Sequence, residues 1–173
     1  MCSGSMTMRT LNRLNNSAMA ARIGLCRPMD ASELAKALAA IGERNKRARM
    51  AQLLDYGSVV SETHLRGAYL NALVAFEERT NIARTLAMET LLFAAMTRQI
   101  SVAVERLGAK PGRMLVLMCS DRRTYDWCAR LLGGCSAFRT TGTHERAAAR
   151  ALGVAGIGAE AVLGAMSMAR LRD

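Results

Sequence analysis

Three cysteines and one histidine in the C-terminal half are candidate metal ligands. They are Cys119, Cys128, Cys135 and His144, and eight, six and eight residues lie between them. Zinc sites normally include a close pair such as Cys-x-x-Cys, because two ligands on one short segment are already near each other when the ion binds. The chain contains no such pair. The spacing argues against a metal centre, and no cofactor is predicted.

Cys119 also stands at the end of a predicted strand, where it could act as a nucleophile with His64 or His144 as its base. A buried cysteine far more often packs as a small apolar side chain. The glycine-rich segment Gly153–Gly158 follows a predicted helix rather than a strand, so it differs from a dinucleotide-binding loop and is expected to be a turn. These patterns favour a protein that is not an enzyme.

Glu89 is the one charged residue between Arg84 and Arg98, in a segment that is apolar on almost every side. An unpaired buried carboxylate destabilises a fold, so Glu89 is expected to face an arginine or a helix terminus. A structural ion pair is the favoured interpretation. Orientation of an arginine in a binding site is the alternative.

The segment Thr97-Arg98-Gln99 is expected to open a helix, with Thr97 as its N-cap. A helix N-terminus has unpaired backbone N–H groups and a partial positive charge. Arg98 and Gln99 in its first turn would therefore form a cradle for a phosphate or a nucleotide edge. An ordinary capped helix in which Arg98 pairs with Glu89 accounts for the same residues equally well.

The net charge points to an anionic partner. The 173 residues carry 24 Lys and Arg against 14 Asp and Glu, a net charge of +10, and only three of the basic residues are lysines. Arginine binds phosphate bidentately and stacks on bases, so this composition permits a surface that faces RNA. A GC-rich genome would also raise the arginine content, with the charge serving only solubility. Aromatic residues are only 4%, which argues against an aromatic stacking platform.

The cysteine count and the hydropathy bear on location. Five cysteines, an odd number, are spread along the chain, which argues against a closed disulfide framework and fits a reducing compartment. The longest apolar runs reach about a third of the ~20 residues that a spanning helix needs. The sequence therefore predicts a cytoplasmic protein that does not span a membrane.

Apolar periodicity divides the chain into short strands and helices. Strands are expected at residues 20–27, 50–56, 113–119 and 135–140. Helices are expected at residues 30–42, 61–76, 82–96, 97–108, 121–132, 143–152 and 159–172. This order predicts an α/β (α+β) protein with a small, mainly antiparallel sheet of about four strands, covered by helices in a single domain.

Polar residues are expected to set several of these boundaries. Asp30 followed by Glu33 is a capping-box pattern, Gly42 is expected to end that helix, and Asn81 is placed as the N-cap of the helix at 82–96. Residues 1–19 are basic and show no apolar period through their first part, so we expect an N-terminal tail that is disordered or loosely docked. The domain itself is expected to span residues 20–173.

The segment from Asn81 to Lys110 resembles the small kinase-associated subunit of the KEOPS (EKC) complex, the family of the PRPK-binding protein TPRKB. It shares an Asn81-Ile-Ala start, a Met88-Glu89 centre and a Thr97-Arg98-Gln99-Ile100 junction before a helix that ends in glycine. The strand near Gln52, the helix start near Glu62 and the strand at 114–118 extend the resemblance, which covers about residues 20–172. Ala95-Met96 departs from the usual Ser-Gly of the family.

This resemblance implies a non-catalytic subunit that binds the atypical, PRPK-like kinase-ATPase of the complex. It also implies recruitment of tRNA through the 3′ CCA end for threonylcarbamoyladenosine modification. The alternative is a purely protein–protein regulator of the kinase with no direct RNA role. The residues assigned to RNA are Asn81, Arg84, Arg98 and Gln99, and those assigned to the kinase are Val162, Leu163, Met166 and Ala169. The last four follow one stripe of the C-terminal helix, which would serve equally well to pack that helix on its own sheet.

Overall fold

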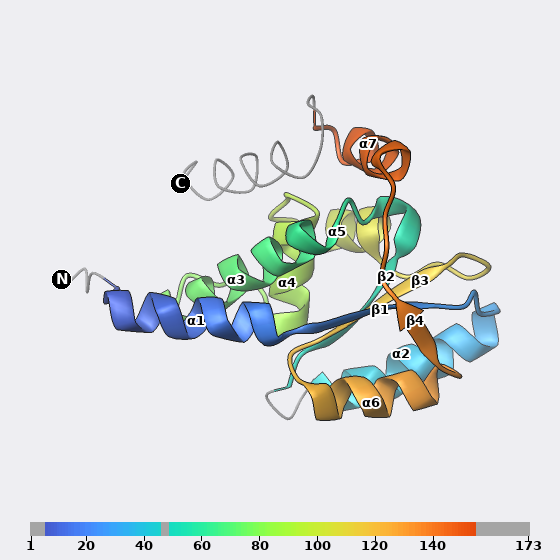
Figure 1. Cartoon of the computed structure of the whole chain (residues 1–173), viewed down its shortest axis with the longest axis horizontal. Coiled ribbons are helices and arrows are strands. Elements are labelled where there is room, and N and C mark those ends of the chain that lie inside the picture. Colours follow the sequence, from blue (N-terminus) through green and yellow to red (C-terminus); the bar gives the residue numbers. More distant parts are fainter. Residues whose placement is uncertain (1–5, 46–48, 155–173) are drawn as a thin grey trace.

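The computed structural model describes residues 6–45 and 49–154. In these residues seven α-helices surround a four-stranded antiparallel sheet with the strand order β2-β3-β1-β4 (Figure 1). The strands are β1 (Arg22–Cys26), β2 (Ala51–Asp55), β3 (Leu115–Cys119) and β4 (Cys135–Ala137). The predicted fold class, a small antiparallel sheet covered by helices in one domain, is confirmed.

Strand β3 is buried on both faces. It pairs with β1 on one side and with β2 on the other, and all five of its residues are buried. Val116 and Met118 belong to the apolar core on one face, whereas Leu115, Leu117 and Cys119 belong to the core on the other. Because successive side chains of a strand alternate between faces, a continuous apolar run places β3 between two layers of helices.

One of these layers consists of α2 (Ala31–Asn45) and α6 (Arg122–Leu131), which lie on the same face of the sheet (Figure 1). Helix α2 connects β1 to β2, and α6 connects β3 to β4. The parallel strands β1 and β2 are separated by β3. This arrangement is the split βαβ motif.

The start of α2 agrees with the prediction, but its end does not. The Asp30 carboxylate accepts a hydrogen bond from the Glu33 N–H at 2.8 Å, and the Glu33 carboxylate accepts one from the Asp30 N–H at 3.4 Å. The helix continues past Gly42 to Asn45. The Asn45 amide exchanges two hydrogen bonds with the backbone of Ala51 on β2, at 2.9 and 2.8 Å. These contacts fix the last turn and outweigh the ~1 kcal/mol that a mid-helix glycine costs.

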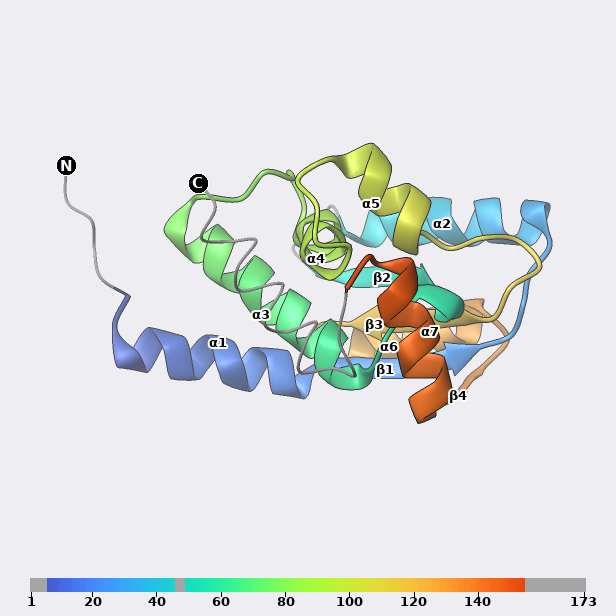
Figure 2. The same ribbon diagram turned by 90° about the horizontal axis from the view of Figure 1, so that it is seen from above.

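The opposite layer contains α3 (Glu62–Glu78), α4 (Leu86–Ala94), α5 (Ile100–Leu107) and α7 (Gly142–Ala151). Figure 2 shows α4 between α3 and α5, above the sheet. Six of the nine residues of α4 are buried. The apolar character of this helix on almost every side predicts such a central position, and the structure confirms it.

The N-terminal segment is more ordered than the sequence predicts. Residues Met8–Ala20 form helix α1, whose N-cap Thr7 accepts a hydrogen bond from the Thr10 N–H at 3.2 Å. Leu14 and Ala18, one turn apart, are buried, and α1 packs against α3 of the layer opposite α2 and α6. An apolar pair at i and i+4 is enough to dock a helix when the partner surface is already formed.

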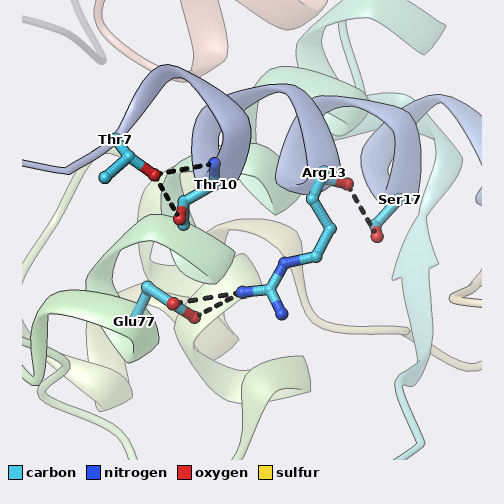
Figure 3. A network of polar contacts seen from close by, with 5 residues as sticks. All are labelled: Thr7, Thr10, Arg13, Ser17 and Glu77. Atoms are coloured by element: carbon cyan, nitrogen blue, oxygen red, sulfur yellow. Dashed lines mark hydrogen bonds and ion pairs between the residues drawn. The ribbon is translucent and has the colours of Figure 1, made fainter.

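Polar contacts to α3 hold α1 in place. The Arg13 guanidinium bonds both carboxylate oxygens of Glu77 at 3.0 Å (Figure 3). Arg66 donates to the backbone carbonyls of Ala18 and Met19 at 2.8 and 2.7 Å. Of the two expected states of residues 1–19, disordered or loosely docked, the helix over residues 8–19 corresponds to a docked segment, while the division of the chain at residue 19 stays a prediction.

A disulfide bond joins Cys26 and Cys135, although the odd number of cysteines argues against a closed disulfide framework and fits a reducing compartment. The two residues lie 109 positions apart in the sequence. They face each other because β4 pairs with β1 in a register that places Cys135 opposite Cys26. The sequence does not reveal this pairing, since strand order decides it. Strand β4 itself ends at Ala137, three residues earlier than expected.

Candidate functional site

The candidate site lies around α4, and its first part is the loop of residues 81–85 that leads into this helix. Glu89, only 2% exposed, accepts hydrogen bonds through Oε2 from the backbone N–H groups of Ile82 and Ala83, at 3.0 and 2.7 Å. Because Glu89 is in the first turn of α4, the helix dipole also favours its negative charge. Of the two expected partners, an arginine or a helix terminus, the structure shows the helix terminus, and the favoured ion pair with an arginine is not formed among the described residues.

The helix start corrects a second prediction. Thr85, not Asn81, is the N-cap of α4, and its hydroxyl accepts from the Met88 N–H at 3.3 Å. The Asn81 amide instead donates to the carbonyl of Ala83 at 2.9 Å and holds the loop. Asn81 is half-buried, whereas Arg84 is exposed. The loop is therefore fixed from inside by Asn81 and Glu89 and presents Arg84 to solvent.

The second part of the site is the turn between α4 and α5. Gln99, not Thr97, occupies the N-cap position of α5, and it makes no side-chain capping hydrogen bond. The Thr97 hydroxyl accepts from the Gln99 N–H at 3.2 Å. Arg98 and Gln99 are thus exposed just before the first turn of α5 rather than inside it. Since no side chain caps this helix, its N-terminal N–H groups can bind an anion.

Two side chains hold this turn from below. His64, which is fully buried, donates from Nε2 to the carbonyl of Ala94 at 2.9 Å and accepts at Nδ1 from the Val60 N–H at 3.3 Å. Arg106 donates to the carbonyl of Ala95 at 3.4 Å. Burial lowers the pKa of His64 to about 4, so the imidazole is neutral at physiological pH. A neutral ring fits its roles as donor to one backbone group and acceptor from another.

Met96 has a left-handed backbone conformation, with φ at 51°. Glycine adopts this conformation without steric strain, whereas a residue with a Cβ pays roughly 1 kcal/mol. The position is the one where the sequence departs from the Ser-Gly of the family that it resembles. The structure thus keeps the turn that a glycine would favour and fills it with a half-buried methionine.

The four residues assigned to RNA flank α4 at its two ends. Asn81 and Arg84 precede the helix, and Arg98 and Gln99 follow it. Nine helical residues extend about 13 Å, so the structure does not gather the four side chains around a single phosphate. An extended single strand that runs along α4 is long enough to contact both ends.

The other predicted residues play no joint role in the described part of the chain. The thiols of Cys119 and Cys128 are buried. The hydrogen bond that the Cys119 thiol donates to Cys128, together with burial, raises the pKa of Cys119, which makes it a poor nucleophile. His144 bonds the Val59 carbonyl at 2.8 Å and stacks on Tyr56. No group of three metal-binding side chains occurs among the described residues.

The residues assigned to the kinase, Val162, Leu163, Met166 and Ala169, lie outside the described residues, as does most of the expected glycine turn. In the part of the chain that the structure describes, no helix is long and apolar enough to cross a membrane.

Comparison with known proteins then decides the family. The family described as kinase binding protein CGI-121 matches residues 29–129 of the chain. This segment runs from just before α2 into α6 and contains both ends of α4. The chain belongs to the CGI-121 family. The description of that family names a protein that binds a kinase, and the prediction of a regulatory chain that is not an enzyme agrees with it.

A curated relative of the CGI-121 type is similar over a shorter segment. The regulatory protein Cgi121 of Methanocaldococcus jannaschii is 32% identical over 83 residues, which are 48% of this chain and 54% of the relative. The chain therefore matches about half the length of this relative. The resemblance drawn from the Asn81–Lys110 motifs is confirmed at the level of the family.

Sequence reasoning missed the residues that position the site. Thr85 directly precedes an apolar run, which is the usual signal of an N-cap, and it competes with Asn81 for that role. Ser61 caps α3 by accepting from the His64 N–H at 3.1 Å, so the Ser-x-x-His spacing predicts where α3 begins and places His64 in its first turn. Its contact with Ala94, 30 positions away, has no signal in the sequence.

The left-handed turn at Met96 leads to a comparison of two variants. Both Met96→Gly and Met96→Ala remove the side chain, but only glycine relieves the backbone strain. We expect the glycine variant to be about 0.5–1 kcal/mol more stable than the alanine variant in urea unfolding. The control is Ala95→Gly at φ −82°, which should destabilise the protein by a similar amount. Equal stability of the two Met96 variants would contradict the proposed strain.

Burial of His64 predicts a dependence of stability on pH. Its pKa is about 4 in the folded state and about 6.5 in the unfolded chain, so the unfolded state binds more protons between these values. The free energy of unfolding should therefore decrease by about 3 kcal/mol as the pH falls from 6.5 to 4. Urea unfolding at a series of pH values measures this. His64→Gln should reduce the change in the free energy of unfolding with pH, whereas His144→Gln should leave that change as it is in the wild type. If both variants show the same dependence on pH, other titratable groups cause the effect.

Proposed function

We propose that this chain is the small non-catalytic subunit of a KEOPS-type complex. In this role it binds the PRPK-like kinase-ATPase and recruits tRNA through the 3′ CCA end for threonylcarbamoyladenosine modification. Membership of the CGI-121 family supports the kinase contact. The observation that carries the RNA contact is the turn after α4, where Arg98 and Gln99 are exposed beside the uncapped N-terminus of α5.

The geometry of α4 supports a particular mode of RNA binding. A phosphate placed at the first turn of α5 would accept hydrogen bonds from backbone N–H groups and from the Arg98 guanidinium. A second phosphate of the same strand would lie near Arg84, about one helix length away. Because exposed aromatic rings are scarce in the chain, arginine guanidinium groups would stack on the bases. A single-stranded 3′ end is flexible enough to follow this surface.

A purely protein–protein regulator remains the second candidate, and one observation favours it. Ile82, Ile100 and Val104 are 43%, 44% and 45% exposed, and all three lie on the loop before α4 or on α5. Ile100 and Val104 are one helical turn apart and so share a face of α5. Apolar side chains on this surface suit a protein partner better than a phosphate backbone.

Arg98→Glu tests the RNA contact. Loss of a phosphate contact and the added repulsion should weaken tRNA binding by about 1–3 kcal/mol. The slope of the logarithm of the binding constant against the logarithm of the salt concentration should decrease in magnitude by about one. Gel shifts with intact and CCA-trimmed tRNA measure the effect, with Arg146→Glu on α7 as a control of equal charge change. We expect trimming to weaken wild-type binding and to make little difference to the Arg98 variant. Unchanged tRNA binding by the Arg98 variant would favour the protein–protein regulator.

The kinase contact is proposed for the stripe Val162, Leu163, Met166 and Ala169, whose spacing predicts one helix face. Met166→Asp should abolish co-elution with the kinase and leave the melting temperature of the isolated protein nearly unchanged. Met168→Asp, which that spacing places off the stripe, is the matched control. A large drop in melting temperature for Met166→Asp alone would show a core position instead, and normal co-elution of both variants would place the kinase elsewhere.

A further inference from the structure

A basic pocket is lined by residues near the end of α2 and the start of α6. These two helices lie on the face of the sheet opposite α4 (Figure 1). The volume of the pocket is about 450 Å³, and its lining residues are Ala40, Glu43, Arg44, Arg49, Arg123 and Trp127. Three guanidinium groups thus surround one recess with a single carboxylate among the lining side chains. None of these residues belongs to the candidate site around α4.

The walls of the pocket include a planar cationic surface. The Arg44 guanidinium carbon lies 4.3 Å from the ring centre of Trp127. Nε of Arg44 is buried and has no hydrogen-bond partner among the described residues. A stacked guanidinium keeps its charge, and guanidinium and indole planes both stack on aromatic rings. The pocket therefore offers a flat surface next to two further arginines.

The charges of the lining side chains favour binding of an anion in this pocket. Arg44, Arg49 and Arg123 line the same recess, and an anion bound there would reduce the repulsion among their like charges. Arginine forks match the oxygens of a phosphate bidentately. The volume lies in the range of pockets that enclose a small organic ligand, so it exceeds what a phosphate ion alone would fill.

We propose that this pocket binds a nucleoside phosphate. Arg49 and Arg123 hold the phosphate oxygens, and the base stacks against the surface formed by Arg44 and Trp127. A nucleoside phosphate combines the anionic group and the flat ring that the two halves of the pocket require.

Trp127 is the one tryptophan of the chain, so its fluorescence reports directly on this pocket. We expect ADP to change the emission saturably, whereas adenosine, which lacks the phosphate, and pyrophosphate, which lacks the ring, bind at least tenfold more weakly. An acidic peptide should produce no saturable change. Absence of a saturable change with ADP at low-millimolar concentration, or equal binding of pyrophosphate and ADP, would overturn the proposal.

Neighbouring arginines provide a matched pair of variants. Arg123→Gln and Arg49→Gln should each weaken ADP binding at least fivefold. Arg122→Gln is the control, because Arg122 is on the same helix turn, bonds Asp126 at 3.0 Å and does not line the pocket. If Arg122→Gln weakens ADP binding as much as Arg123→Gln, the effect is one of general charge and the pocket assignment fails.

The source of the nucleoside phosphate is distinguished by competition. If a short single-stranded RNA displaces ADP, and Arg123→Gln weakens the binding of this RNA as much as it weakens ADP binding, the ligand is a nucleotide unit of RNA. Lack of displacement identifies it as a free nucleotide, and both results support the proposed chemistry. This test is independent of the proposed tRNA contact, because Arg98→Glu should leave ADP binding unchanged.

Discussion

The burial of β3 on both faces is the constraint on which the rest of the structure depends. A five-residue strand whose side chains all avoid water needs a helical layer on each side. The chain meets this need by placing α2 and α6 below the sheet and α3, α4 and α5 above it (Figure 1). Two separate apolar cores follow. Each core then needs every polar group inside it to be paired.

The polar groups in and beside the cores shape the candidate site. His64, fully buried, bonds the end of α4, and Glu89 bonds the loop before it. Asp55, 1% exposed, accepts from Arg113 at 2.7 Å and so fixes the chain where it enters β3. Removal of one partner would leave a buried donor or acceptor unpaired. The exposed arginines at both ends of α4 therefore extend from a backbone that is held from within.

The two-layer arrangement also separates the basic residues into independent surfaces. Arg84 and Arg98 flank α4 above the sheet, whereas Arg44, Arg49 and Arg123 meet below it. Because the sheet and its two cores lie between them, one small ligand cannot contact both groups. Part of the basic excess of the chain thus lies on two surfaces of different chemistry. The surface at the two ends of α4 is extended and has exposed apolar side chains nearby. The surface on the opposite face of the sheet is a pocket in which the Arg44 guanidinium stacks on the Trp127 ring.

The sequence by itself determined what depends on local pattern. The apolar run at 115–119 predicts a central strand, the Asp30–Glu33 pair predicts a helix start, and the apolar segment around Glu89 predicts a covered helix. The family motifs between Asn81 and Lys110 also lie in one continuous stretch. Each of these features rests on residues within a few turns of one another, so their spacing alone carries the information.

Only the tertiary structure decided the contacts between distant residues. Helix α1 is held by Leu14 and by Arg13 on Glu77, the turn after α4 is held by His64, and Cys26 meets Cys135 through the pairing of β1 with β4. The Arg44–Trp127 surface likewise needs α2 and α6 side by side. These partners are tens of positions apart in the sequence. Their proximity follows from strand order and layer packing, which periodicity along the chain does not encode.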